Sequence, residues 1–142
     1  MRTNAYVIGG SIPGLLAASV LAGRYDRVVV LESDDLPDGP TPRRGVPQSR
    51  QLHALLSRGL ATLEELFLGF TAELIARGAV LGDLVGDLHW IIEGRPLSRE
   101  PIGLAGLSAT RPLIEDRIRR RVAALPGVEF VTGVRVVAAR LS

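Results

Sequence analysis

A glycine-rich turn near the amino terminus constrains the fold more than any other feature of this sequence. The apolar run Ala5–Ile8 precedes it, and the Ala- and Leu-rich stretch Leu15–Leu21 follows it. Such runs are typical of a buried strand and of a helix, respectively. Three consecutive valines within Arg27–Leu31 predict a second buried strand. Strand, turn, helix and strand in about 30 residues make a βαβ unit, whose strands are parallel and whose crossover is right-handed.

The turn has the pattern Gly9-x-Ser11-x-x-Gly14, one residue away from the G-x-G-x-x-G of dinucleotide-binding folds. Gly9 allows a sharp turn after the strand, and Gly14 allows the helix to pack closely on the sheet. Ser11 stands where a glycine usually lets backbone amides approach a pyrophosphate. Pro13 lacks an N–H, which costs little stability here because N–H groups in the first helical turn have no partner within the helix. The start of this helix offers N–H groups and partial positive charge to phosphate. The candidate phosphate-binding residues are Gly9, Gly10, Ser11, Ile12, Pro13 and Gly14.

An acidic residue, Glu32, directly follows the second predicted strand. A carboxylate at this point can bond both hydroxyls of an adenosine ribose and disfavours a 2′-phosphate. A plain glycine turn without a ligand is the alternative. The strand before the turn, the helix after it and the terminal Glu32 together favour a dinucleotide site.

Composition excludes several classes of protein and of site. The 142 residues suffice for one domain, and the absence of cysteine excludes disulfide scaffolds, thiolate nucleophiles and Cys-based metal sites. All 17 basic residues are Arg, but the net charge is only +2, so we expect no nucleic-acid partner. No run approaches the roughly 20 apolar residues of a membrane span, and the amino terminus lacks the pattern of a secretory signal. We therefore expect no stable membrane insertion and a cytoplasmic location.

Beyond Glu32 the sequence predicts fewer regular elements. The predicted segments are an irregular Pro-rich loop over Ser33–Arg50, an amphipathic helix over Leu52–Phe67, a shorter helix over Thr71–Arg77, an antiparallel hairpin over His89–Leu97, a loop over Pro101–Ser108, a helix over Arg111–Leu125, and two strands over Val128–Thr132 and Val134–Ala139.

Three segments in order resemble a known family: YVIGGSIPGLLAASVLAGRYDRVVVLESD, RRGVPQSRQLHALL and TRPLIEDRIRRRV. They are similar to the N-terminal portion of FAD-dependent monooxygenases of the para-hydroxybenzoate hydroxylase type, within the glutathione-reductase-like flavoprotein superfamily. The resemblance implies an α/β fold, with a Rossmann-like βαβ dinucleotide-binding unit, a parallel sheet and the start of an antiparallel substrate-domain hairpin. It further implies that residues 1–142 are an incomplete FAD-binding domain, with residues 80–108 as an inserted β-hairpin segment of the substrate domain.

The resemblance also implies roles for residues outside the turn. Arg44, or its neighbour Arg43, matches an arginine that contacts the phosphate or ribose region of FAD. Arg111 matches an arginine near the pyrophosphate, and Val136 matches a residue whose backbone holds the adenine. The planar fork of Arg suits phosphate. A solvated loop is the alternative for Arg43 and Arg44, and Ser11, in place of the usual glycine, narrows the approach of the pyrophosphate.

For the whole enzyme, the resemblance implies hydroxylation or epoxidation of a small aromatic, polyketide or terpenoid substrate, with NAD(P)H as electron donor. The family's later Asp-Gly and Gly-Asp motifs have no counterpart here, so the chain resembles the N-terminal third of such an enzyme. A missing C-terminal segment or a second copy is its expected protein partner. The alternatives are a non-catalytic remnant or dinucleotide-binding module, an NAD(P)-dependent reductase, and a flavin reductase or halogenase. No side chain is a candidate catalytic acid or base.

Other polar residues receive structural interpretations. His53, on the polar side of the predicted Leu-rich helix, and His89 have no carboxylate at metal-ligand spacing, so we expect no metal site. The pairs Asp34/Asp35 and Asp83/Asp87 fit turn chemistry better than acid–base work, and Trp90 is expected in the core.

The arginines of the last predicted helix are interpreted as a solvated face. Two favourable i,i+4 pairs, Glu115–Arg119 and Asp116–Arg120, support this interpretation.

Overall fold

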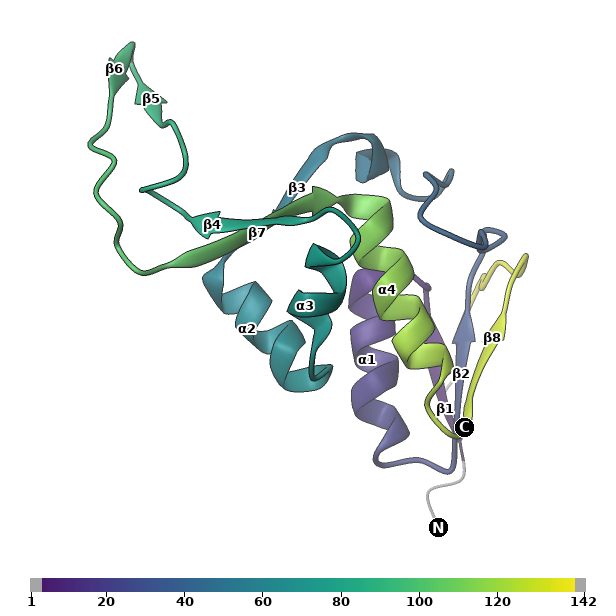
Figure 1. Cartoon of the computed structure of the whole chain (residues 1–142). Coiled ribbons are helices and arrows are strands. Elements are labelled where there is room, and N and C mark those ends of the chain that lie inside the picture. Colours follow the sequence, from purple (N-terminus) through teal and green to yellow (C-terminus); the bar gives the residue numbers. More distant parts are fainter. Residues whose placement is uncertain (1–3, 140–142) are drawn as a thin grey trace. The chain divides into compact units, whose positions relative to one another are not determined.

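In the computed structural model, which describes residues 4–139, the chain divides into two units (Figure 1). The first unit comprises the residues up to Arg50 and those from Arg111 onward, and the second comprises Gln51–Thr110. The elements of the first unit are β1 (Asn4–Ile8), α1 (Ile12–Ala22), β2 (Arg27–Leu31), the 3-10 helix η1 (Pro47–Arg50), α4 (Arg111–Ala123) and β8 (Val128–Val131).

The first unit is built on a parallel sheet of order β1-β2-β8. Helix α1 connects β1 to β2, as the βαβ pattern predicts, and begins three residues earlier than expected, at Ile12. Val7 lies opposite Val30 in the β1–β2 register. Because the three valines of β2 form the middle strand, all are buried and the strand shows no polar alternation.

Helices α1 and α4 pack side by side and cover one face of this sheet. Leu15 of α1 and Ile114 and Ile118 of α4 are fully buried. Burying each of these side chains stabilises the fold by about 1.5–3 kcal/mol. The apolar stripe of α4 therefore fixes this helix against α1 and beside the start of the turn.

Strand β8 ends earlier than the β-rich sequence suggests. The predicted strand Val134–Ala139 does not form, and this prediction is wrong. Gly133 has a positive φ of 69°, and Val134 donates its N–H to the Glu32 carbonyl oxygen at 3.0 Å. Because β2 ends at Leu31, no neighbouring strand continues alongside these residues, so β propensity has no ladder to satisfy.

The second unit contains an antiparallel sheet of order β3-β7-β4 and a separate hairpin of β5 and β6. Its elements are β3 (Leu52–Leu55), α2 (Ser57–Leu66), α3 (Phe70–Ile75), β4 (Val80–Asp83), β5 (Ile91–Ile92), β6 (Arg95–Pro96) and β7 (Ala105–Thr110). The expected short helix and hairpin are both present, with slightly different bounds.

Two predictions in the second unit are wrong for one reason. The expected helix over Leu52–Phe67 begins only at Ser57, and the expected loop over Pro101–Ser108 ends in strand β7. Strands β3 and β7 pair with each other, and His53, predicted on a helix, lies opposite Ala109. A partner more than 50 residues away in the chain thus overrides the local helical spacing.

Trp90 also departs from expectation, because its side chain is 47% exposed instead of belonging to the core. Its indole N–H donates to the Leu84 carbonyl oxygen at 2.6 Å. Within residues 4–139, none of the helices combines the length and apolarity needed to cross a membrane.

Candidate functional site

The glycine turn has the local geometry that its sequence predicts. Gly9 has a φ of 97°, which L-residues with side chains rarely adopt, and its N–H donates to the Leu31 carbonyl oxygen at 2.8 Å. A Cβ on Gly14 would collide with the Gly9 carbonyl oxygen and approach Val7 Cγ1 to 3.3 Å. Glycine at position 14 is therefore required for α1 to start this close to β1.

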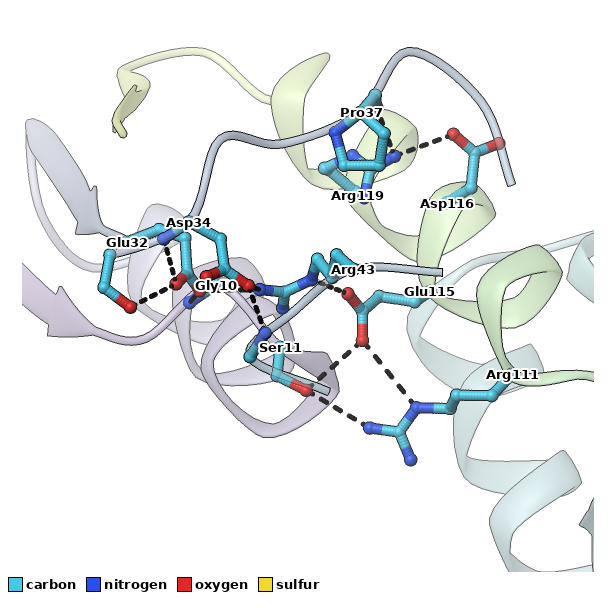
Figure 2. Close-up of polar contacts among 12 residues, drawn as sticks. Gly10, Ser11, Glu32, Asp34, Pro37, Arg43, Arg111, Glu115, Asp116 and Arg119 are labelled. Atoms are coloured by element: carbon cyan, nitrogen blue, oxygen red, sulfur yellow. Dashed lines mark hydrogen bonds and ion pairs between the residues drawn. The ribbon is translucent and has the colours of Figure 1, made fainter. Parts of the chain in front are cut away.

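Ser11 is the N-cap residue of α1, but its side chain makes no capping bond. The hydroxyl instead donates to Glu115 Oε2 and accepts from Arg111 Nη2, both at 3.2 Å (Figure 2). Ser11 is thus held toward α4. Its hydroxyl leaves the first-turn N–H groups of Ile12 and Gly14 to other acceptors.

Glu32 is 5% exposed and joins the end of β2 to the turn. Its Oε2 accepts the Gly10 N–H at 2.7 Å, and its Oε1 accepts the Asp34 N–H at 2.9 Å and the Ser33 hydroxyl at 3.1 Å. Burial acts to raise the pKa of Glu32, but the two amide bonds and the charge of Arg43 outweigh it and hold the pKa below its ordinary value. The carboxylate is therefore ionised at neutral pH.

Arg43 lies in the middle of the cluster, with a side chain only 7% exposed. Its Nε donates to Glu115 Oε1 at 2.7 Å, and its Nη1 donates to Asp34 Oδ2 at 3.0 Å and lies 3.3 Å from Glu32 Oε2. Burial acts to lower the pKa of Arg43, but the bond to Glu115 and the surrounding carboxylates raise it overall. Its Nη2 is buried and has no hydrogen-bond partner among residues 4–139.

Hollows adjoin this cluster. Two of them, of about 410 and 530 Å³, are lined by loop residues that include Arg43 and Arg44. Another of about 190 Å³ brings Gly9 and Glu32 together with Val136. Arg44 is exposed, so of the two loop arginines it is Arg43 that the fold brings to the turn.

The solvated face predicted for α4 is wrong for Arg117 and Arg119, which are buried together with Glu115 and Asp116, whereas Arg120 is exposed as predicted. The predicted pair Asp116–Arg120 is present at 3.3 Å, but Arg119 also pairs with Asp116, at 3.0 Å, while Glu115 turns to Arg43.

Arg119 donates to the Pro37 carbonyl oxygen at 2.8 Å, so the Pro-rich loop covers this face of α4. The spacing of charges along the helix could not predict that the Pro-rich loop packs over this face.

Sequence reasoning missed two residues of the cluster, Asp34, which was interpreted as a turn residue but accepts from Arg43, and Glu115. The available signal for Glu115 was its position four residues after Arg111, which makes an i,i+4 pair with Nε and Oε2 3.7 Å apart. The sequence predicts a surface pair for Glu115 instead, since nothing local indicates that Arg43 and Ser11 lie within its reach.

The second unit carries a different polar cluster around Asp83. Its Oδ1 accepts the N–H groups of Val85 and Gly86 at 2.9 and 2.8 Å, and its Oδ2 accepts that of Gly103 at 2.8 Å. These bonds confirm the turn role predicted for Asp83 and Asp87, whose Oδ2 accepts the Asp83 N–H at 2.7 Å. The bonds from Gly86 and Val85 lower the pKa of Asp83 to about 2.

Comparison with known proteins adds sequence and structural relatives, although no family model matches the chain. The chain is 36% identical over 137 residues to Protein Rv3254 of Mycobacterium tuberculosis (strain ATCC 25618 / H37Rv), covering 92% of this chain and 28% of that protein. It superposes on the tetrameric form of 2-methyl-3-hydroxypyridine-5-carboxylic acid oxygenase with a TM-score of 0.72 and 26% identity, covering 98% of this chain and 33% of that chain.

A third relative is PqsL, a probable FAD-dependent monooxygenase from Pseudomonas aeruginosa. It has a TM-score of 0.68 at 18% identity, a level that supports the fold alone, and the match covers 99% of this chain and 35% of PqsL. These likenesses confirm the mixed α/β fold with parallel and antiparallel strands. The chain spans about a third of the length of the solved structures it matches.

Proposed function

We propose that this chain, which corresponds to the N-terminal part of the FAD-dependent monooxygenase family, binds the ADP half of FAD at the Gly9–Gly14 turn. The observation that carries the proposal is the bond from the Gly10 N–H to the buried, ionised Glu32. This bond joins a carboxylate suited to ribose hydroxyls directly to a turn suited to phosphate.

In this proposal the diphosphate lies against the first turn of α1. The N–H groups of Ile12 and Gly14 face it there, since Pro13 has none and Ser11 turns its hydroxyl to α4. Because the Ser11 hydroxyl bonds Glu115 and Arg111, we take this side chain to point away from the diphosphate.

Arg43 and Arg111 supply positive charge beside this turn. The unpartnered Nη2 of Arg43 fits an anionic ligand, because a phosphate oxygen would satisfy a buried donor that the described residues leave without an acceptor.

The adenosine would lie over the end of the sheet. Glu32 would accept its ribose hydroxyls, and the hollow that holds Gly9, Glu32 and Val136 would take the adenine against the chain after Gly133. When bound, the flavin itself supplies the redox chemistry. The residues of this chain bind and orient it.

For the whole protein we propose monooxygenation of a small organic molecule, with NAD(P)H as donor and a cytoplasmic location. A structural neighbour named as an oxygenase of a hydroxypyridine carboxylic acid supports an aromatic substrate over a polyketide or terpenoid. The assignment of residues 1–142 to an incomplete FAD-binding domain, with 80–108 as an inserted hairpin, stays a prediction.

The test is a titration of the chain with FAD, followed by flavin fluorescence, with ADP as competitor and NADH as a parallel ligand. We expect saturable FAD binding that ADP reverses. A colourless protein that FAD neither binds to nor stabilises would support the non-catalytic remnant instead. Tighter binding of NADH than of FAD would support a nicotinamide-dependent reductase.

A further inference from the structure

We propose that Glu115 is a positioning residue that holds Arg43 and Ser11 in place for the diphosphate, an inference that rests on the proposed FAD site. Glu115 comes from α4, a helix far from the glycine turn in sequence, and is 4% exposed. It carries no candidate ligand contact of its own. Its role is to set the positions of groups that do.

Both oxygens of Glu115 are engaged. Oε1 accepts from Arg43 Nε at 2.7 Å, and Oε2 accepts from the Ser11 hydroxyl at 3.2 Å and lies 3.7 Å from Arg111 Nε (Figure 2). One carboxylate therefore links the loop after β2, the start of α1 and the first turn of α4. These are the three segments that supply the proposed diphosphate contacts.

The bond through Nε determines which part of Arg43 remains for a ligand. With Nε on Glu115 and Nη1 on Asp34, the guanidinium is fixed at two of its nitrogens, and Nη2 is left as a buried donor without a partner among residues 4–139. Leaving such a donor unsatisfied costs stability. A ligand oxygen that accepts from Nη2 would remove that cost, so the arrangement favours binding of an anion.

The charges around Arg43 explain why Glu115 matters for affinity. Glu32 and Asp34 also attract the guanidinium, and Nη1 already lies 3.3 Å from Glu32 Oε2. Without Glu115, Arg43 would keep only these two charge partners and would shift toward Glu32. That shift would occupy the carboxylate needed for the ribose and would move Nη2 from its place.

The neighbouring Asp116 provides a matched control. It lies on the same helix and is 2% exposed, and it pairs with arginines of that helix. One of these, Arg119, donates to the Pro37 carbonyl oxygen in the loop and not to the glycine turn. Substitution of Asp116 removes a buried carboxylate of α4 and leaves the contacts of Arg43 and Ser11 in place.

The experiment measures FAD and ADP affinities of the full chain by titration, and its unfolding midpoint without ligand by circular dichroism. We expect Glu115→Gln and Arg43→Gln each to weaken ADP at least tenfold. The double variant should bind ADP more tightly than the product of the two single effects predicts, since part of the effect of Glu115 passes through Arg43 and the rest through Ser11. Asp116→Asn should lower the unfolding midpoint but leave ADP affinity within twofold.

A second variant, Glu115→Asp, keeps the buried negative charge and shortens the reach, so it tests the geometry even where Glu115→Gln fails to fold. It should weaken ADP several-fold. Wild-type affinity in either Glu115 variant, or effects of Glu115→Gln and Arg43→Gln that multiply, would overturn the inference while the FAD site stands. A wild-type chain that binds neither FAD nor ADP would overturn the proposed function and this inference with it.

Discussion

Glu32 of the first unit and Asp83 of the second are both carboxylates whose pKa is lowered by backbone N–H donors, yet their surroundings differ. The Asp83 carboxylate accepts the N–H groups of Val85, Gly86 and Gly103, which lie in the loops beside it. Its oxygens are therefore bonded by backbone groups of the second unit. Glu32 lies beside Arg43, whose Nη2 still lacks an acceptor in the described part of the chain.

The comparison teaches that a lowered pKa does not by itself mark a binding site. A carboxylate whose partners are all supplied by nearby turns stabilises those turns. Glu32, at the junction of a strand end and a helix start, is also bonded by its own fold, but it lies beside a buried arginine donor, Arg43 Nη2, that a ligand can still satisfy. The following substitutions test this distinction between the two units.

The largest effect should come from Gly14→Ala in the first unit. The new Cβ would collide with the Gly9 carbonyl oxygen, which belongs to the backbone and cannot rotate away. We expect a loss of about 3 kcal/mol or more of unfolding free energy, the upper range for an overpacked site. The measurement is thermal unfolding by circular dichroism.

Gly59→Ala in α2 is the control for that substitution. Gly59 lies inside a helix with open space around the position of a Cβ, so alanine should stabilise α2 by about 0.5–1 kcal/mol. Equal unfolding midpoints for both variants would contradict the close approach of α1 to β1.

Glu32→Gln should separate binding from stability. The amide loses the charge that attracts donors, and hydrogen bonds to a charged group contribute about 1.5–3 kcal/mol. We expect ADP affinity to fall roughly 10- to 100-fold. Asp83→Asn, measured in the same titration, should leave ADP affinity unchanged. If it weakens ADP as much as Glu32→Gln does, the functional distinction between the two carboxylates is wrong.

The contribution of the Asp83 carboxylate to stability should depend on pH. Because the pKa of Asp83 falls from 3.8 to about 2 on folding, its contribution to stability is fully present above pH 3.8. That contribution is lost as the pH falls through about 2. The difference in unfolding midpoint between wild type and Asp83→Asn should therefore be constant from pH 7 to about pH 4 and shrink below it. A difference that persists undiminished at pH 2 would exclude this assignment.

The smallest effect should come from Arg44→Gln. Arg44 is exposed, and substitutions at such positions change stability or binding by about 0.5 kcal/mol or less. Arg43→Gln, its neighbour, should weaken ADP strongly. Equal losses of ADP affinity in the two variants would show that Arg44 also contributes to binding. They would contradict the assignment of the phosphate contact to the buried Arg43.

Much of the first unit could be predicted because its signals are local. The apolar run before Gly9, the helix after Gly14 and the valines before Glu32 each depend on neighbours within a few residues. The positive φ of Gly9 and the crowding at Gly14 follow from the same short segment.

Contacts between distant segments could not be predicted in this way. The local spacing predicts helix where strand β3 forms, because its partner β7 lies far along the chain. Strand β7, which contains Gly106 and Ser108, has no strong apolar pattern of its own. The residues of Val134–Ala139 favour β structure and predict a strand, but among residues 4–139 no partner strand continues beside them.

The order of residues along the chain was enough to specify the βαβ unit, its glycine turn and the acid that follows it, since each arises from short-range sterics and periodicity. Only the tertiary structure decides which arginine approaches the turn, which carboxylate holds that arginine and which face of α4 is buried. These features depend on the packing of the loop after β2 against α4. Charge pairing between segments 72 residues apart, such as Arg43 and Glu115, depends on distances that folding alone creates.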